Sequence, residues 1–208
     1  GLGDVYKRQV LDTYKNNELV NRVRYDYQGK KETEEKMVRE YYPEGTLKSE
    51  IFLRDGKKDG PAKFYYESGY LKEEWNYVND TLHGTCYTFY ETGVLESSMD
   101  YIRGLRRGTT RNYYDTGELQ SEYMYSDNLR NGIALTYHRD GRLESSMRYI
   151  DGIRNGPFKL FHENGLVKTE GSYVNGNISG VVTTYYKNGG VMKLETFING
   201  KPDGWVKT

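Results

Sequence analysis

Residues 41–64 read YYPEGTLKSEIFLRDGKKDGPAKF, and the same pattern returns every 24 residues along the rest of the chain. Two sets of glycines mark this period without a slip. The first set follows an aromatic pair and comprises Gly45, Gly69, Gly93, Gly117, Gly141, Gly165 and Gly189. The second set comprises Gly60, Gly84, Gly108, Gly132, Gly156, Gly180 and Gly204. A fixed period of this size is typical of repeat arrays, in which each unit packs on its neighbours and not around one central core.

Apolar and polar residues alternate within each repeat. Aliphatic or aromatic side chains recur at the positions of Leu47, Ile51 and Leu53, and mostly polar side chains lie between them. Residues of equal parity share one face of a strand, so the alternation predicts strands with one buried and one exposed face. Glycines recur too often in residues 41–208 to leave a window long enough for a helix.

The glycines predict where the chain turns. Pro43-Glu44-Gly45 places Gly where a hairpin turn needs a positive φ, and Asp55-Gly56 is a dipeptide favoured in tight reversals. The second glycine set, which begins at Gly60, predicts a bulge or a place where chains pass closely. Each repeat is therefore expected to hold two antiparallel strands and two turns. The predicted fold class is all-β, an elongated antiparallel sheet or solenoid of tandem β-hairpins.

The regular array is expected to cover residues 41–208 as seven repeats. Residues 10–40 are interpreted as a degenerate repeat, in which Tyr14–Leu19 aligns with Tyr42–Leu47 and residues 30–36 form a longer charged loop. We expect that loop to be a solvated excursion.

Both ends look cut. Residues 1–9, GLGDVYKRQ, resemble a translated sequencing-adapter read-through, and a disordered polar leader is the alternative. Trp205–Thr208 is expected to begin a further strand that then stops. We therefore expect a fragment of a longer protein.

Composition narrows the classes of function. Lys+Arg 30 balances Asp+Glu 30, which argues against a duplex-binding protein driven by phosphate neutralisation, and no nucleic-acid partner is expected. The single cysteine, Cys86, excludes an internal disulfide. No apolar run is long enough to span a bilayer. A cytoplasmic protein is favoured, with the cell envelope or secretion as alternatives because the chain lacks an initiator Met.

The consensus Y-Y-x-x-G-x-L-x-x-E-x-x-Y-x-x-G-x-x-x-G resembles the MORN-repeat variant. The copies that follow it best are YYPEGTLKSEIFLRDGKKDG (41–60), YYDTGELQSEYMYSDNLRNG (113–132) and FHENGLVKTEGSYVNGNISG (161–180). Asp80 and Asn128 depart from it where the second turn usually has Gly, and we expect these two turns to be weaker.

The resemblance implies antiparallel sheets of successive hairpins. Many bacterial members are YwqK-type antitoxins, which neutralise a partner toxin. The wider MORN family is associated with scaffolding, with self-association and, in some proteins, with binding to anionic phospholipids. A toxin–antitoxin role, a scaffold and a lipid-binding surface are therefore the expectations that the resemblance adds.

One charged feature stands out as a candidate binding site. Arg106, Arg130 and Arg154 are equivalent in three consecutive repeats. Successive equivalents lie two strands apart, about 10 Å at the usual strand spacing, and arginines at that pitch could grip phosphates or the carboxylates of a partner. The alternative is that they are solvated loop residues paired with nearby acids.

No catalytic or metal site is predicted. His138 and His162 lie one period apart and could share a metal, but each stands where other repeats have Tyr, which favours a place in an aromatic column. Cys86 matches Ala62, Thr110 and Ala134, which favours packing. A carboxylate recurs in several repeats on the exposed face, as at Glu50, which is typical of a solvated strand.

These observations favour a non-catalytic repeat protein that binds another protein through a tyrosine-rich face, with a toxin as one partner and no cofactor. A membrane-surface module that binds anionic headgroups through the arginines is the first alternative. A structural repeat arm of a larger protein is the second, and an enzyme ranks last.

Overall fold

The computed structural model describes residues 8–204, and every regular element in that range is a β-strand. No helix in this range could cross a bilayer. The chain divides into two compact units. Unit 1 runs to Gly93 and adds Ile102–Gly104, and unit 2 holds Val94–Tyr101 and continues from Leu105.

Unit 1 contains the first eight strands of the described range. They are β1 (Gln9–Lys15), β2 (Glu18–Tyr25), β3 (Lys31–Tyr41), β4 (Leu47–Arg54), β5 (Lys57–Tyr65), β6 (Leu71–Val78), β7 (Thr81–Leu82) and β8 (Gly84–Phe89). Unit 2 contains the other eleven strands, except that Ile102, the last residue of β9, belongs to unit 1. They are β9 (Leu95–Ile102), β10 (Leu105–Tyr113), β11 (Leu119–Ser126), β12 (Leu129–Tyr137), β13 (Leu143–Ile150), β14 (Ile153–Phe161), β15 (Val167–Val174), β16 (Asn177–Ile178), β17 (Gly180–Tyr185), β18 (Val191–Ile198) and β19 (Lys201–Pro202).

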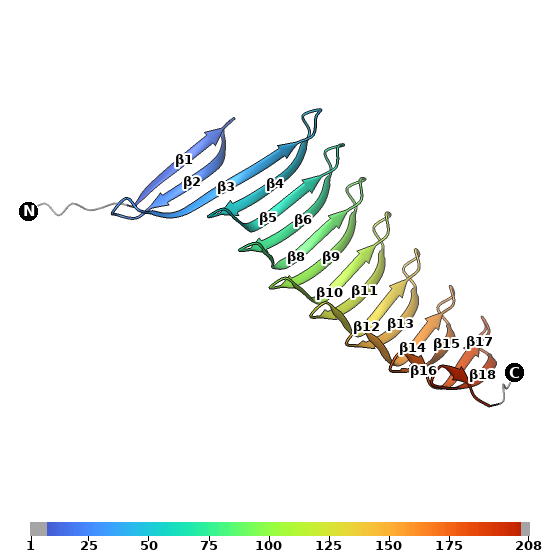
Figure 1. Cartoon of the computed structure of the whole chain (residues 1–208). Coiled ribbons are helices and arrows are strands. Elements are labelled where there is room, and N and C mark those ends of the chain that lie inside the picture. The colour runs from blue at the N-terminus through green and yellow to red at the C-terminus, as the bar shows by residue number, and fades with distance from the viewer. Residues whose placement is uncertain (1–7, 205–208) are drawn as a thin grey trace, which may run out of the picture. The chain divides into compact units, whose positions relative to one another are not determined.

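Within each unit, strands that follow one another in the chain also pair side by side and antiparallel (Figure 1). The register repeats with the sequence: Ile51 of β4 lies opposite Ala62 of β5, and Tyr123 of β11 lies opposite Ala134 of β12, 72 residues on. The predicted fold class, an all-β antiparallel sheet of hairpins with a 24-residue period, is therefore confirmed.

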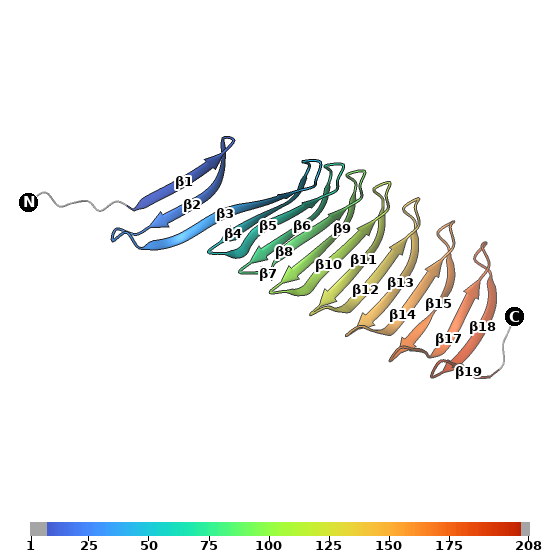
Figure 2. The same ribbon diagram turned by 45° about the horizontal axis from the view of Figure 1, so that its top comes forward.

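Two kinds of turn alternate along the chain and lie at opposite ends of the strands within each unit (Figure 2). In the first kind, the Gly45 amide donates to the Tyr42 carbonyl at 2.9 Å and Gly45 has φ 90°. In the second kind, two residues reverse the chain with positive φ at both, as at Asp55 and Gly56. Such two-residue turns match the twist of the strands they connect. Both predicted turn positions are confirmed.

Where Asp80 and Asn128 replace Gly in the second kind of turn, each side chain forms a hydrogen bond that Gly could not form. Asp80 and Asn128 adopt φ 63° and 69°, in the left-handed region that Asp and Asn tolerate. The Asp80 carboxylate accepts a hydrogen bond from the Lys58 amide at 2.7 Å, and the Asn128 side-chain carbonyl accepts one from the Arg106 amide at 2.8 Å. Each side chain thus ties its turn to the preceding hairpin, so the expectation of plainly weaker turns overlooks this added bond.

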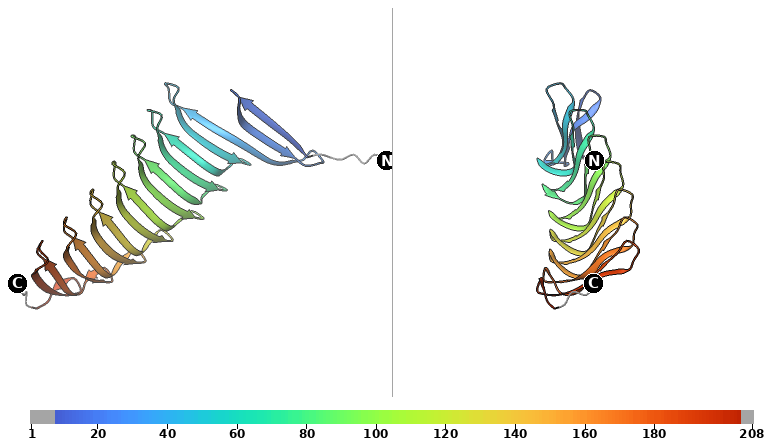
Figure 3. Two further views of the ribbon diagram at one scale, coloured as in Figure 1. Left: turned by 180° about the vertical axis from the view of Figure 1, so that it is seen from behind. Right: turned by 90° about the vertical axis from the view of Figure 1, so that its right-hand side faces the viewer.

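The second glycine set lies at β-bulges, as the sequence indicated. Gly132 has φ 115°, and the pairing of β11 with β12 shifts register between Tyr123 and Tyr125. The same irregularity separates the two-residue strands β7 and β16 from the longer strands β8 and β17 that follow them. Bulges increase local twist and bend the strand that carries them. The right-hand view in Figure 3 shows that the strands of unit 2 are curved.

The core is a band of small side chains on one face of the sheet. Two positions of the repeat supply nearly all of its buried residues. They are Ser49, Ser97, Ser121 and Ser145 at one position, and Ala62, Cys86, Thr110, Ala134, Phe158 and Val182 at the other. Some buried hydroxyls are satisfied across the strands, as where Thr136 Oγ1 and Ser145 Oγ lie 2.7 Å apart, but Thr110 Oγ1 is buried without a hydrogen-bond partner. The Cys86 side chain is fully buried, which agrees with a packing role.

The N-terminal segment differs from its prediction. The charged residues expected to form a long loop belong, from Lys31 onward, to strand β3. They are held there because β3 pairs with β2 on one side and β4 on the other, and Glu35 of β3 meets an arginine from each. Asn16 and Asn17 form a two-residue turn with φ 51° and 63°, which is the second kind of turn and not the first.

The predicted ends fall mostly outside the described residues. Gln9 begins β1, so the last residue of the excluded leader is part of the sheet. The strand expected at Trp205–Thr208 lies outside the described range. The division of the chain into segments 1–9, 10–40 and 41–208, the last with seven repeats, stays a prediction.

Candidate functional site

The three candidate arginines lie at the start of three strands of unit 2. Arg106 is in β10, Arg130 in β12 and Arg154 in β14, each two residues after a two-residue turn. Such a hairpin pairs residues five apart, so Tyr125 lies opposite Arg130 and Tyr149 lies opposite Arg154. Each arginine therefore shares its face of the sheet with the tyrosine of its own hairpin.

The guanidinium groups alternate with tyrosine side chains along the unit. Arg106 Cζ lies 5.7 Å from the Tyr101 ring centre and 4.9 Å from that of Tyr125. Arg130 lies 4.0 Å from Tyr123 and 5.5 Å from Tyr149. These are cation–π distances, in which the charge faces the negative face of the ring.

The third arginine continues the series. Arg154 lies 5.4 Å from the Tyr173 ring centre, and its Nε donates to the Tyr149 hydroxyl at 3.3 Å. We name the whole set the Arg–Tyr ladder. Its members are Arg106, Arg130, Arg154, Tyr101, Tyr123, Tyr125, Tyr149 and Tyr173.

Electrostatics within the ladder raise the pKa of all three arginines and lower that of Tyr149. Burial raises the pKa of Tyr149, but hydrogen bonds from Arg154 and Arg130 lower it by more, so this pKa lies below the ordinary value of 10.0. Burial lowers the pKa of Arg130, and hydrogen bonds with Tyr125 and Tyr149 more than restore it. The arginines thus keep a permanent positive charge although part of each side chain is covered.

No carboxylate among residues 8–204 forms an ion pair with Arg106, Arg130 or Arg154. Their polar partners are tyrosine hydroxyls, together with the sulfur of Met99 at 3.4 Å from Arg106. Beside Arg130 lies a hollow of about 380 Å³, lined in part by Tyr114 and Tyr123, with Glu144 also on its wall. The ladder therefore presents three positive charges that neutral groups hold in place.

The opposite face of the same strands behaves differently. Arg111 Nε donates to Glu122 at 2.7 Å, and Lys159 lies 3.1 Å from Glu170. Arg107, next to Arg106 in the chain but on the other face, pairs with Asp127. These three basic residues are neutralised by nearby acids, whereas the three arginines of the ladder are not.

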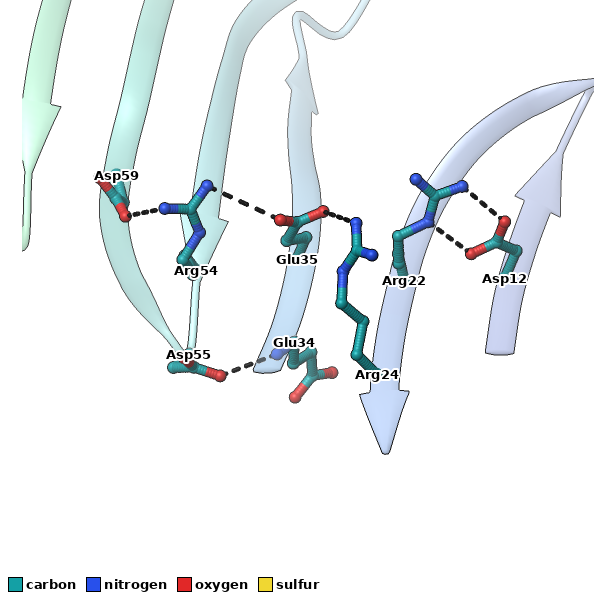
Figure 4. A network of polar contacts seen from close by, with 8 residues as sticks. All are labelled: Asp12, Arg22, Arg24, Glu34, Glu35, Arg54, Asp55 and Asp59. Carbon is teal, nitrogen blue, oxygen red and sulfur yellow. Dashed lines mark hydrogen bonds and ion pairs between the residues drawn. The ribbon is translucent and has the colours of Figure 1, made fainter. Parts of the chain in front are cut away.

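Unit 1 also pairs its arginines with acids, as Figure 4 shows. Arg22 of β2 donates two hydrogen bonds to Asp12 of β1, at 2.8 and 2.7 Å, and holds the Asp12 pKa below its usual value. Arg54 of β4 lies 2.9 Å from Asp59 and 3.6 Å from Glu35. Most arginines outside the ladder are thus paired with acids, and Arg103 and Arg148 are the exceptions among residues 8–204.

Sequence reasoning recognised that the three arginines occupy equivalent positions but described their surroundings wrongly. The alternative of solvated loop residues paired with acids is contradicted, since all three lie in strands and their partners are tyrosines. The tyrosine column was recognised separately. Its link to the arginines was missed, although the signal was present: in three consecutive hairpins Tyr and Arg stand five residues apart across the two-residue turn, as Tyr125 and Arg130 do.

Comparison with known proteins adds the family. The family model described as the MORN repeat variant matches six stretches that cover more than half of the chain: residues 34–55, 58–79, 82–103, 106–127, 154–175 and 178–199. The chain belongs to this family. Arg106 and Arg154 are the first residues of their matched MORN repeats. No curated protein matches the chain.

Solved structures resemble it only weakly. The structure entitled "Crystal Structure of TcdB2-TccC3-TEV" is 13% identical, with a TM-score of 0.27. The match covers 93% of this chain but only 13% of the other chain. A porin-like protein from Bacteroides uniformis ATCC 8492 is 10% identical with a TM-score of 0.23, covering 96% of this chain and 91% of its own. A protein of unknown function from Bacteroides fragilis NCTC 9343 is 8% identical, with a TM-score of 0.17 and coverage of 95% and 96%. None of these likenesses bears on function.

The two histidines occupy the aromatic column of the MORN repeats. In other repeats the tyrosine hydroxyl donates to a backbone carbonyl 23 residues on, as from Tyr114 to Tyr137 at 2.8 Å. His162 Nε2 lies 3.1 Å from the Tyr185 carbonyl and takes the same place. His138 Nε2 is buried without a hydrogen-bond partner. Among residues 8–204, no three His, Cys, Asp or Glu side chains are arranged to hold a metal ion.

His138→Tyr is expected to stabilise unit 2 by about 1 kcal/mol. The tyrosine hydroxyl can donate a hydrogen bond to the Phe161 carbonyl, and the substitution removes the unsatisfied buried Nε2 of His138. Urea unfolding followed by circular dichroism measures the gain. His162→Tyr is the matched control and should change stability less, since its ring already has a partner. Equal effects of the two substitutions would contradict this explanation.

Proposed function

We propose that this chain is a non-catalytic repeat protein that binds another protein through the Arg–Tyr ladder of unit 2. The observation that carries the proposal is the absence of any acidic partner for Arg106, Arg130 and Arg154 within the described residues, while most other arginines there are paired. Partly covered charges without counter-ions favour a ligand that brings its own carboxylates.

The chemistry of the face supports protein binding. Tyrosine and arginine are the residues that most often dominate the energy of protein interfaces, because each offers a large contact area together with directional polar groups. Arginine can also bind a carboxylate through two parallel hydrogen bonds. The rings of Tyr125 and Tyr149 hold the guanidinium groups in place before a partner arrives, which reduces the entropy lost on binding.

The test is affinity capture from the native host with three forms of the full chain as bait. The first is the unaltered protein. The second is the ladder variant, Arg106→Glu with Arg130→Glu and Arg154→Glu. The third is the control variant, Arg107→Glu with Arg111→Glu and Arg148→Glu, which makes the same change of charge on the opposite face.

A partner that the unaltered protein and the control variant capture, and that the ladder variant loses, is the expected result. Thermal unfolding of all three forms checks that the ladder variant remains folded. Capture that the ladder variant retains would reject the ladder as the binding face. A complete lack of specific capture by the unaltered protein would reject the proposal as a whole.

The finer proposal is that the partner is a toxin and the chain its antitoxin. The MORN repeat variant resemblance supports this role, and an acidic surface on the toxin would complement the ladder. Co-expression tests it: the captured protein should arrest growth when expressed alone, and this chain, but not its ladder variant, should restore growth. A partner without toxicity would reject the antitoxin role and leave protein binding intact.

A membrane surface is the second candidate, which the same three guanidinium groups favour because they also suit phosphate. Flotation with vesicles that contain phosphatidylserine tests it. Binding that disappears in the ladder variant and persists in the control variant would support the lipid role. Failure of the unaltered protein to float would reject it.

A further inference from the structure

The spacing of the Arg–Tyr ladder has a consequence for the shape of its ligand. Arg106, Arg130 and Arg154 are separated by one intervening strand in each case, β11 and then β13. Neighbouring strands lie about 4.8 Å apart, so consecutive guanidinium groups repeat at about 10 Å along the unit. A ligand that engages all three must place negative charges at this interval on one side.

Regular polypeptide conformations differ in how well they meet that interval. A polyproline II segment rises about 3.1 Å per residue with three residues per turn, so every third side chain returns to the same side after about 9.3 Å. On an α-helix, side chains two turns apart lie on the same side, about 10.8 Å from one another. A β-strand places every second side chain on one side, about 6.7 Å apart. Over the two intervals from Arg106 to Arg154, the side-chain spacing of a polyproline II segment departs least from the spacing of the guanidinium groups.

The tyrosines of the ladder favour the same conformation. Polyproline II segments are bound by surfaces lined with aromatic rings, where prolines pack between the rings and little conformational entropy is lost. Tyr101, Tyr125 and Tyr173 are partly exposed beside the arginines and provide such rings, whereas Tyr149 is buried. The hollow beside Arg130, lined also by Tyr123, gives room for a side chain to enter.

We propose that the ladder binds an extended, acidic, proline-containing segment that carries a carboxylate at every third residue and runs across the strands of unit 2. This inference rests on the proposed protein-binding function and specifies its partner. Each carboxylate meets one guanidinium, and the residues between pack on the tyrosine rings. The charge of the segment is opposite to that of the ladder, and its period matches that of the repeat.

Fluorescence anisotropy with two labelled synthetic peptides of identical composition tests the period. One carries Glu at every third position with Pro and Ala between, and the other has the same residues with Glu unevenly spaced. The regular peptide is expected to bind the full chain about tenfold more tightly, and the ladder variant should lose that binding. The control variant, with its changes at Arg107, Arg111 and Arg148, should bind as the unaltered protein does.

The outcomes separate this inference from the proposed function. Equal binding of both peptides, lost in the ladder variant, would overturn the spacing inference and leave an acidic partner in place. Binding of neither peptide, while ladder-dependent capture from the host persists, would also overturn only the inference. Binding of phosphatidylserine vesicles through the ladder, without peptide binding or protein capture, would overturn both and leave the membrane role.

Discussion

Leu135→Pro is expected to remove most of the stability of unit 2, whereas Ile133→Pro, two residues earlier in β12, should leave the unit folded. Leu135 lies opposite Glu122 of β11 and Ser146 of β13, so proline there removes a hydrogen bond from the interior of the sheet. That loss, with the fixed φ of proline, costs about 3 kcal/mol or more in regular structure.

The repeat itself supplies the control for this prediction. Pro61 and Pro157 stand at the position equivalent to Ile133, next to the bulge, where the backbone already accommodates proline. Urea unfolding of the two variants gives the comparison. Similar losses of stability for Leu135→Pro and Ile133→Pro would show that the repeats are not structurally equivalent at β12.

Gly132→Ala is expected to destabilise unit 2 by about 2 kcal/mol, because Gly132 has φ 115° in a region that other residues rarely adopt. An added Cβ would also lie 3.0 Å from the sulfur of Met124, and that flexible side chain can move aside. Most of the cost is therefore backbone strain at the bulge.

Gly152→Asn is the matched control, again at a positive φ of 82°. Its position in the repeat is held by Asp80 and Asn128 elsewhere, and each of them gains a hydrogen bond to a preceding strand. We expect this variant to unfold within about 0.5 kcal/mol of the unaltered protein. A large loss at Gly152, or none at Gly132, would contradict the distinction between the two glycine positions.

The sequence was sufficient for most of the fold because its information is repeated. Gly45 and Gly60 predicted a turn and a bulge, and six further copies of each made the prediction secure. The segment before Tyr41 has no such support. There, one alignment of Tyr14–Leu19 gave the wrong kind of turn, and the high charge of β3 concealed a strand whose acids are neutralised by its neighbours.

The candidate site could be predicted only in part. The equivalence of Arg106, Arg130 and Arg154 follows from the period alone. Their partners do not, because whether an arginine meets an acid or a ring depends on the face it shares and the reach of its side chain. Arg106 and Arg107 are neighbours in the chain, yet one lies against tyrosines and the other against Asp127. The buried serines, such as Ser121, were likewise missed, because a polar side chain gave no apolar signal on the face predicted to be buried.

The central claim is that residues 24 apart occupy successive places along unit 2, which is what aligns the ladder. Pulsed electron spin resonance tests it on the full chain in a Cys86→Ala background, with spin labels at exposed, equivalent positions. The pair Asp115→Cys with Glu163→Cys should lie about 20 Å apart and the pair Asp115→Cys with Lys187→Cys about 30 Å apart. A second distance no longer than the first would contradict the account.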